Sequence, residues 1–354
     1  MAMAEIRNKR VVEDVAIIGG LIGVQFIYAG NAFLMSYAMS LGLTSLTIVI
    51  FTSLATFLVL FPVAFYFERT KWPKECKLKL IMQLLFLSFG GLAFQCLFLK
   101  GINLTSPAMG TAMPNLAPGL IFIMSWTFGL ESVNLRNTHS KVKILGTLLC
   151  VFGALTMSIM QSISAPPETG FEATVQSSST PLQFVFDKHK MIGSLYLVAA
   201  VFILSSSVVL QAFVLGDFAA PMSLGAITSL LGAFMTAVFQ LLTEHQLKTD
   251  WQVLRFKDLI GYSFLAGVAS GICLCFNGWA LKKKGPVLVS MFSPIATVCS
   301  VIFSFVTMRD TINFGSIAGM LLMFTGLYLV LWAKDKEGNA RGNNGNEIEK
   351  AFLS

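Results

Sequence analysis

The sequence predicts an all-α membrane protein of ten transmembrane helices, arranged as two inverted repeats of five helices. Composition indicates the membrane class: 55% of the 354 residues are hydrophobic and only 12% are charged, against roughly 25% charged in a soluble domain. Mean hydropathy is +0.74. An internal repeat indicates two halves, because residues 51–68 recur as residues 227–244 with Thr, Ser, Leu and Glu in register. A repeat of this kind inside apolar segments is typical of a duplicated helical bundle.

Ten apolar stretches have the length of about 20 residues that a helix needs to cross a bilayer. They are too long and too continuously apolar for the strands of a membrane barrel, and lipid tolerates no unpaired backbone, so we expect helices. The alternative, long buried helices of a soluble protein, is disfavoured by the composition. The stretches are residues 14–35, 44–67, 78–99, 106–128, 142–160, 192–215, 224–242, 259–280, 287–308 and 314–332.

The first five stretches form the predicted first repeat. The first follows a charged leader and is too long for the apolar region of a signal peptide, so we expect a signal anchor. The second contains the first copy of the repeated residues, and the third follows a basic loop. The fourth contains Pro114 and Pro118, which free backbone carbonyls and predict a kink. The fifth contains Gly146 and Gly153, seven residues apart.

The second five stretches repeat these signals. The sixth begins after a linker rich in Ser, Thr and Pro, and the seventh contains the second copy of the repeat. The eighth has a Gly-x-x-x-Gly spacing that starts at Gly267 and favours close helix packing. Pro294 in the ninth stretch lies 176 residues after the second proline of the fourth. The tenth contains Gly319 and Gly326, again seven residues apart.

The two halves are predicted to be inverted relative to each other. Five crossings per half is an odd number, so the second half begins on the opposite side of the membrane. We expect the polar tail to be disordered, because it is poor in apolar residues. The predicted units are a cytoplasmic leader (1–13), a first five-helix repeat (14–160), an external linker (161–190), a second five-helix repeat (191–333) and a cytoplasmic tail (334–354).

Basic residues predict the orientation. With the N-terminus in the cytoplasm, 18 of the 25 lysines and arginines lie in segments on the cytoplasmic side. This excess predicts that both termini are cytoplasmic. The net charge of +7 is then mostly a topology signal, and nucleic acid is not an expected partner.

Several chemistries have no support in the sequence. Acidic, basic and histidine side chains are absent from the middle of all ten stretches, so a proton carrier is not indicated and passive exchange down a gradient is favoured. The chain has no phosphate-binding loop for ATP. The six cysteines suggest neither a disulfide framework nor a metal site, and we expect no cofactor. Paired carboxylates and a nucleophile with its base are also absent, so an enzyme is not expected.

Neutral polar side chains form the predicted binding site. Buried amides in lipid need hydrogen-bond partners, and a polar cavity between the two halves provides them. Hydrogen bonding between helices is the alternative role of each residue. The set suits a small polar or zwitterionic substrate and consists of Gln25, Tyr28, Asn31, Gln95, Asn115, Gln211 and Asn277. The predicted hinges are Pro114, Pro118 and Pro294.

Several motifs resemble those of a known family. Residues 283–294 read Lys-Lys-Gly-Pro-Val-Leu-Val-Ser-Met-Phe-Ser-Pro, and residues 326–332 read Gly-Leu-Tyr-Leu-Val-Leu-Trp. Residues 100–107 follow Lys-x-x-x-Leu-Thr-Ser-Pro, and residues 114–118 follow Pro-Asn-Leu-x-Pro. Together they resemble the plant Walls-Are-Thin-related, nodulin-like (UMAMIT) transporters of the drug/metabolite transporter superfamily, which have paired EamA domains.

The resemblance implies ten helices, cytoplasmic termini and facilitated, often bidirectional movement of amino acids, usually export. It also implies that Gln25, Tyr28 and Asn115 line the central pathway. This sequence departs from many relatives at Thr52, where they have an arginine, and at Arg309 and Asp310, where they have paired glutamates. The first departure removes a cationic contact for a substrate carboxylate.

We therefore expect a facilitator that exports amino acids or similar small polar metabolites by alternating access. The plasma membrane is the expected location, with the vacuolar membrane as the alternative. An auxin or other organic-acid transporter is one rival hypothesis. A membrane scaffold or immune regulator without transport, acting through its basic loop at residues 69–79, is the other. The lipid bilayer and a small-molecule substrate are the expected partners, and the oligomeric state stays open.

Overall fold

The structure is a computed structural model that describes residues 2–40, 44–72, 78–105, 113–131, 138–164, 188–244, 256–308 and 314–352. Every regular element in these ranges is a helix, and they contain no strand, which confirms the predicted all-α class. Seven of the described helices are long and apolar enough to cross a membrane. The chain is therefore a multi-pass membrane protein, and the full number of ten spans stays a prediction.

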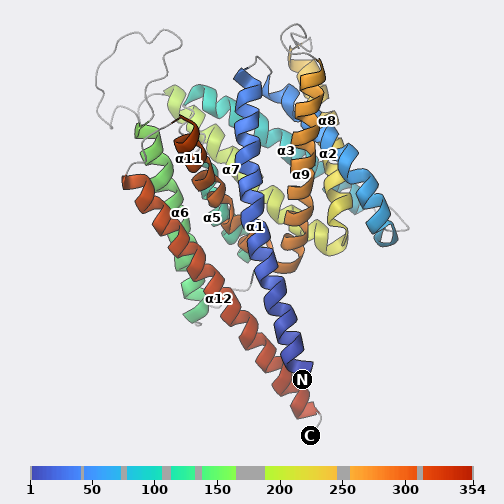
Figure 1. Ribbon diagram of the computed structural model, residues 1–354, viewed down its shortest axis with the longest axis vertical. Coiled ribbons are helices and arrows are strands. Elements are labelled where there is room, and N and C mark those ends of the chain that lie inside the picture. The colour runs from blue at the N-terminus through green and yellow to red at the C-terminus, as the bar shows by residue number, and fades with distance from the viewer. Residues whose placement is uncertain are drawn as a thin grey trace.

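The helices follow the predicted apolar stretches along the chain (Figure 1). The fourth and ninth stretches each correspond to two shorter helices, and the other eight each correspond to one. The first predicted half contains α1 (Ala2–Ser40), α2 (Ser45–Glu68), η1 (Arg69–Lys71), α3 (Leu78–Leu104), η2 (Met113–Leu116), α5 (Ala117–Thr127) and α6 (Thr138–Ser164). The second contains α7 (Lys188–Asp217), α8 (Pro221–Glu244), α9 (Phe256–Lys284), α10 (Pro286–Met291), α11 (Ser293–Met308) and α12 (Phe314–Phe352).

Both ends of the chain lie on one side of the bundle. The first part of α1 and the last part of α12 project beyond the other helices at the bottom of Figure 1, where the N- and C-termini are marked. The expectation of a disordered tail was wrong, because α12 continues to Phe352. No proline interrupts α12, so its ladder of hydrogen bonds extends past the apolar stretch.

Helix packing follows one pattern in both halves. Helix α1 packs on α9 and α11, and its predicted counterpart α7 packs on α3 and α5. Because α3 and α5 are the predicted counterparts of α9 and α11, exchanging the two repeats maps one set of neighbours onto the other. The pair α2 and α8 and the pair α6 and α12 each join a helix to its own counterpart. This packing is compatible with two related halves.

Helices α6 and α12 touch through glycines. A Cβ on Gly326 would lie 2.5 Å from the carbonyl oxygen of Gly146, and a Cβ on Gly153 would lie 2.7 Å from that of Gly319. Residue numbers rise along one helix as they fall along the other, so the two helices are antiparallel. The largest buried cluster includes residues of α1, α6 and α10 to α12, among them Leu21, Cys150, Phe292 and Val330.

Two helices are interrupted at equivalent points. The 3₁₀ turn η2 ends at Leu116 and α5 begins at Ala117, whereas α10 ends at Met291 and α11 begins at Ser293. The new helices begin 176 residues apart, the same offset that separates Pro118 from Pro294. Each proline is the second residue of its helix, and it cannot donate a backbone hydrogen bond to the preceding turn. The interruptions agree with the predicted kinks, while a hinge role for these prolines stays a prediction.

Candidate functional site

Two polar pairs join α1 to α9, which pack side by side. The Asn277 amide nitrogen donates to the Tyr28 hydroxyl at 3.0 Å. The Asn31 amide nitrogen donates to the Ser270 hydroxyl at 3.4 Å. Tyr28 and Asn31 lie about one turn apart on α1, so they present polar groups on nearly the same side. The structure therefore brings together three of the predicted residues, and Gln25 is buried one turn earlier on α1.

A third pair joins the two interrupted helices. Asn115 in η2 is only 5% exposed. Its side-chain oxygen accepts a hydrogen bond from the Thr297 hydroxyl of α11 at 3.3 Å. Asn115 thus links the first half of the sequence to the second immediately beside both interruptions.

Gln95 and Gln211 lie on α3 and α7, the predicted counterparts of α9 and α1. These helices also pack side by side. Within the part of the chain that the structure describes, no hydrogen bond joins Gln95 to Gln211. The prediction that they share a pathway with the α1 residues stays a prediction.

Some buried polar atoms near these helices have no hydrogen-bond partner among the described residues. They include the side-chain oxygens of Gln95 and Asn277 and the hydroxyls of Ser88 and Ser125. Leaving such an atom unsatisfied costs about 1–3 kcal/mol, so each has free capacity for a hydrogen bond from another molecule. The two amide oxygens act only as acceptors, so they favour a solute that carries N–H or O–H donors.

Sequence reasoning missed Ser270 and Thr297. Ser and Thr are common in membrane helices, where their hydroxyls often donate to a carbonyl in the preceding turn, as Thr56 does to Thr52. Nothing in the sequence marks the ones that cross to another helix, and Thr56 itself also donates to the Gly267 carbonyl of α9 at 3.3 Å. The Gln25, Tyr28 and Asn31 pattern was the available signal for this face of α1, and it did not point to Ser270.

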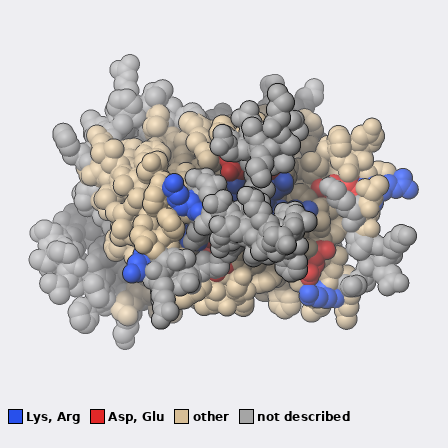
Figure 2. Space-filling model, turned by 90° about the horizontal axis from the view of Figure 1, so that it is seen from below, with Lys and Arg blue, Asp and Glu red and all other residues tan. Residues whose placement is uncertain are grey.

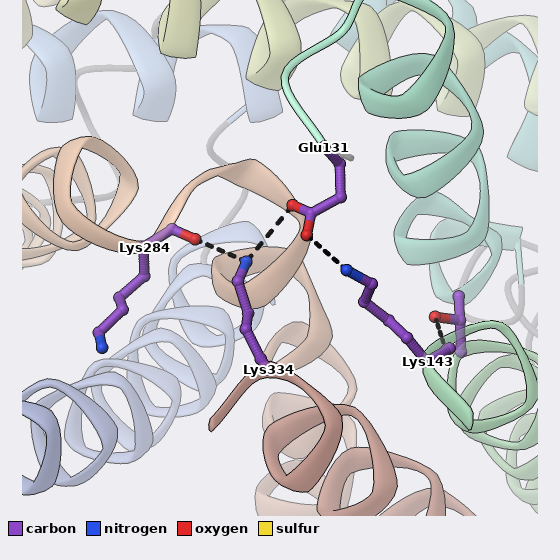
Figure 3. Close-up of polar contacts among 5 residues, drawn as sticks. Glu131, Lys143, Lys284 and Lys334 are labelled. Carbon is purple, nitrogen blue, oxygen red and sulfur yellow. Dashed lines mark hydrogen bonds and ion pairs between the residues drawn. The ribbon is translucent and has the colours of Figure 1, made fainter. Parts of the chain in front are cut away.

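A second polar cluster lies at the end of the bundle where the termini project. It consists of Glu131, Lys143 and Lys334 together with the backbone carbonyl of Lys284, and we call it the Glu131 cluster (Figure 3). The Lys143 ammonium donates to Glu131 at 2.9 Å, and that of Lys334 donates to the same carboxylate at 3.4 Å. Lys334 also donates to the Lys284 carbonyl at 2.7 Å.

The end of α5 positions the Glu131 carboxylate. Gly129 has a φ of 73°, a left-handed conformation that favours glycine and commonly ends helices. The Glu131 backbone N–H then donates to the Ser125 carbonyl at 3.0 Å, which closes the turn. The carboxylate is 8% exposed and the Lys143 side chain is fully buried. Burial alone would raise the pKa of Glu131, but the charges of Lys334 and Lys143 outweigh it and hold that pKa below its ordinary value.

Other contacts at the same end also join the two halves. Glu68, at the end of α2, accepts hydrogen bonds from the Ser223 backbone N–H at 2.8 Å and from its hydroxyl at 2.9 Å. This carboxylate caps the start of α8, where the free N–H groups and the helix dipole favour a negative charge. Asp14 pairs with Lys284 in a more exposed position. Figure 2 shows basic and acidic side chains close together on this face.

Among the described residues, no group of three or more His, Cys, Asp or Glu side chains lies close enough to hold a metal ion. The candidate site consists of the neutral polar pairs and the Glu131 cluster.

Comparison with known proteins gives three findings. A model of the EamA-like transporter family matches residues 15–159 and 191–332. Two WAT1-related proteins of Arabidopsis thaliana are similar along nearly the whole chain. One is 55% identical and covers 95% of this chain and 91% of the relative. The other is 46% identical and covers 92% of this chain and 90% of the relative. One solved crystal structure matches with a TM-score of 0.62 at 18% identity, covering 90% of this chain and 97% of that one, which shows a shared fold.

Proposed function

We propose a specific transport activity for this chain, which belongs to the EamA-like transporter family and, within it, to the plant WAT1-related proteins. Membership makes it a membrane transporter. The proposed activity is facilitated, bidirectional movement, mainly export, of amino acids or similar small polar metabolites. The proposed architecture is ten spans in two inverted repeats, residues 14–160 and 191–333, with both termini in the cytoplasm and the protein in the plasma membrane. The vacuolar membrane is the alternative location.

The Tyr28–Asn277 pair carries this proposal. It places a hydroxyl and an amide between α1 and α9, one helix from each half. The Asn277 side-chain oxygen remains buried without a partner among the described residues. An ammonium group of a substrate would supply the missing donors, and the neighbouring hydroxyl and amide N–H groups could donate to a carboxylate. Gln25, Asn31, Gln95, Asn115 and Gln211 complete the proposed path.

Alternating access is supported by the arrangement of the helices. Exchanging the two repeats maps the neighbours of α1 onto those of α7. Related halves that exchange conformations open a central site first to one side and then to the other. The interruptions at Pro118 and Pro294 are equivalent points at which α5 and α11 could tilt against the segments before them, and Pro114 lies in the turn before Pro118.

Passive exchange is supported by where the buried charges lie. The buried charged side chains of the described residues are Glu68, Glu131 and Lys143. Glu68 is the last residue of α2, Glu131 follows α5, and Lys143 lies near the start of α6. None of the three is near the middle of a helix, where a proton carrier would be expected.

Efflux of labelled amino acids from preloaded cells tests the proposal. Cells expressing the wild type are compared with cells expressing Asn277→Ala and with a matched control, Asn103→Ala, which removes an exposed amide from α3. We expect flux that ignores an imposed pH gradient, that falls in Asn277→Ala and that is unchanged in Asn103→Ala. Flux that requires the gradient would overturn passive exchange.

The rival functions give different results in the same cells. Competition by indole acids but not by glutamine would identify an organic-acid transporter. Absence of flux for every amino acid and organic acid tested would favour the scaffold or immune-regulatory role.

A further inference from the structure

The Glu131 cluster contains three contacts: one within each half of the chain and one between the halves (Figure 3). Glu131 and Lys143 both belong to the first half of the chain, and their contact is short, 2.9 Å. Lys334 and the Lys284 carbonyl both belong to the second half, and their contact is also short, 2.7 Å. The contact between the halves, from Lys334 to Glu131, is the longest of the three at 3.4 Å.

The contact between the halves is reversible, because each half keeps a short contact of its own. Removing one member of a buried ion pair is strongly destabilising, because the other charge is left alone. If the two halves part here, Glu131 keeps Lys143 and Lys334 keeps the Lys284 carbonyl. No buried charge loses its last partner, so the Glu131–Lys334 contact can break and form again at modest cost.

The cluster lies where several helices end. Lys284 is the last residue of α9, and Glu131 follows the end of α5. Helix α9 packs mainly on α1 and α2, α5 packs mainly on α7, and both also pack on α10. Lys334 on α12 contacts both ends at once. If this end of the bundle opens by separating the ends of α9 and α5, Lys334 must give up either Glu131 or the Lys284 carbonyl.

Other ion pairs at this end are less suited to such a role. Lys79 and Asp217 are 73% and 56% exposed, and exposed pairs contribute little. Glu131 is 8% exposed and Lys334 is 21% exposed. Charge at the Glu131 cluster is therefore far less screened by water.

The sequence offers no equivalent cluster at the opposite end. The repeat offset of 176 residues places Thr307 at the position that corresponds to Glu131. The offset between Gly146 and Gly319 makes Ser316 the counterpart of Lys143. It makes Gln161 the counterpart of Lys334. All three counterparts are neutral, so the charged contact acts at one end of the molecule.

We propose that Lys334 is a reversible latch that holds the end of the bundle predicted to face the cytoplasm closed. Its contact with Glu131 stabilises the closed arrangement, and its loss shifts the transporter toward the state that is open to this side. This inference rests on the proposed alternating access, and it adds the residue that sets the balance between the two states.

Accessibility of a buried position near the latch tests the inference. Ser290 on α10 is 7% exposed, and α10 packs against α5, α9 and α12. Ser290→Cys is introduced into the full-length protein in membrane vesicles, and a membrane-impermeant maleimide is applied to the cytoplasmic side. Mass spectrometry of the peptide that contains position 290 gives the labelling rate without interference from the native cysteines.

We expect Lys334→Met to raise this labelling rate about fivefold, at the upper end of the range for exposed ion pairs, because this pair is less screened by water. The matched control is Lys336→Met, which removes an exposed charge two residues further along α12. Its labelling rate should equal that of the protein with Ser290→Cys alone. Equal rates for Lys334→Met and Lys336→Met in folded protein would overturn the latch.

A second variant covers the case in which Lys334→Met does not fold. Lys334→Gln loses the charge but can still donate to the Lys284 carbonyl, and it should also raise the labelling rate. The outcome is separable from the transport proposal, because labelling needs no substrate. Increased labelling without flux of any solute would support the latch and refute the proposed transport. Normal flux with unchanged labelling would refute the latch alone.

Discussion

Gly146 on α6 and Gly326 on α12 meet backbone to backbone: a Cβ on Gly326 would lie 2.5 Å from the Gly146 carbonyl oxygen. Gly153 and Gly319 meet in the same way further along the two helices. The sequence repeat makes Gly146 equivalent to Gly319 and Gly153 equivalent to Gly326. Exchanging the repeats therefore turns the first contact into the second. An antiparallel pair with this property is what an inverted duplication would produce.

Stability should depend strongly on this contact. Gly326→Ala places a methyl group against the backbone of α6, and overpacking of this kind typically costs about 1–3 kcal/mol. Gly232→Ala on α8 is the matched control, since a Cβ there meets nothing within 4 Å. We expect thermal unfolding of the purified protein in detergent to occur at a lower temperature for Gly326→Ala. Gly232→Ala should unfold at or above the wild-type temperature. Equal unfolding temperatures for both variants would contradict the backbone contact.

The polar pair between α1 and α9 should control flux. Tyr28→Phe keeps the ring but removes the hydroxyl that accepts from Asn277, and a typical hydrogen bond contributes about 1 kcal/mol. We expect efflux to fall about fivefold in Tyr28→Phe and in Asn277→Ala. The double variant should lose less than the sum of the two effects, because both single changes break one contact. Fully additive losses would show that the two side chains act independently.

Long apolar segments were the most predictable part of this protein. Each predicted stretch overlaps at least one helix in the part of the chain that the structure describes, because the need to satisfy backbone groups in lipid leaves few alternatives. The repeated glycines were visible in sequence, but their contact with each other was not. The partners Ser270 and Thr297 could not be found, since a hydroxyl that crosses between helices has no sequence signature. The Glu131 cluster was missed because its members are far apart in sequence and lie near helix ends, where charged residues are common.

The break between α10 and α11 should increase the rate of transport. Pro294→Ala restores a backbone N–H and permits the helix to continue into α10, which would stiffen a segment proposed to bend. We expect a several-fold lower rate of exchange, with the amount of protein in the membrane unchanged. Pro62→Ala is the control, because Pro62 lies inside α2 on an exposed surface. Exchange at the wild-type rate in Pro294→Ala would remove the hinge role.

Titration of Glu131 gives a prediction about pH. Lys334 and Lys143 hold the pKa of this carboxyl below its ordinary value of 4.5, although burial alone would raise it. A lowered pKa means that the folded protein prefers the ionised form more than the unfolded chain does. The resulting stability is fully present above the ordinary carboxyl pKa and is lost as pH falls through the lowered pKa.

Unfolding temperatures of the wild type and Glu131→Gln, measured from pH 8 downward, test this. The wild type should be more stable by an amount that stays constant from about pH 8 to about pH 5 and shrinks only at lower pH. The latch would then keep its charge throughout the physiological range, so pH would not open it. A stability difference that already declines between pH 8 and pH 6 would mean that Glu131 takes up a proton near neutrality. In that case Glu131 would become a candidate proton carrier, and passive exchange would have to be abandoned.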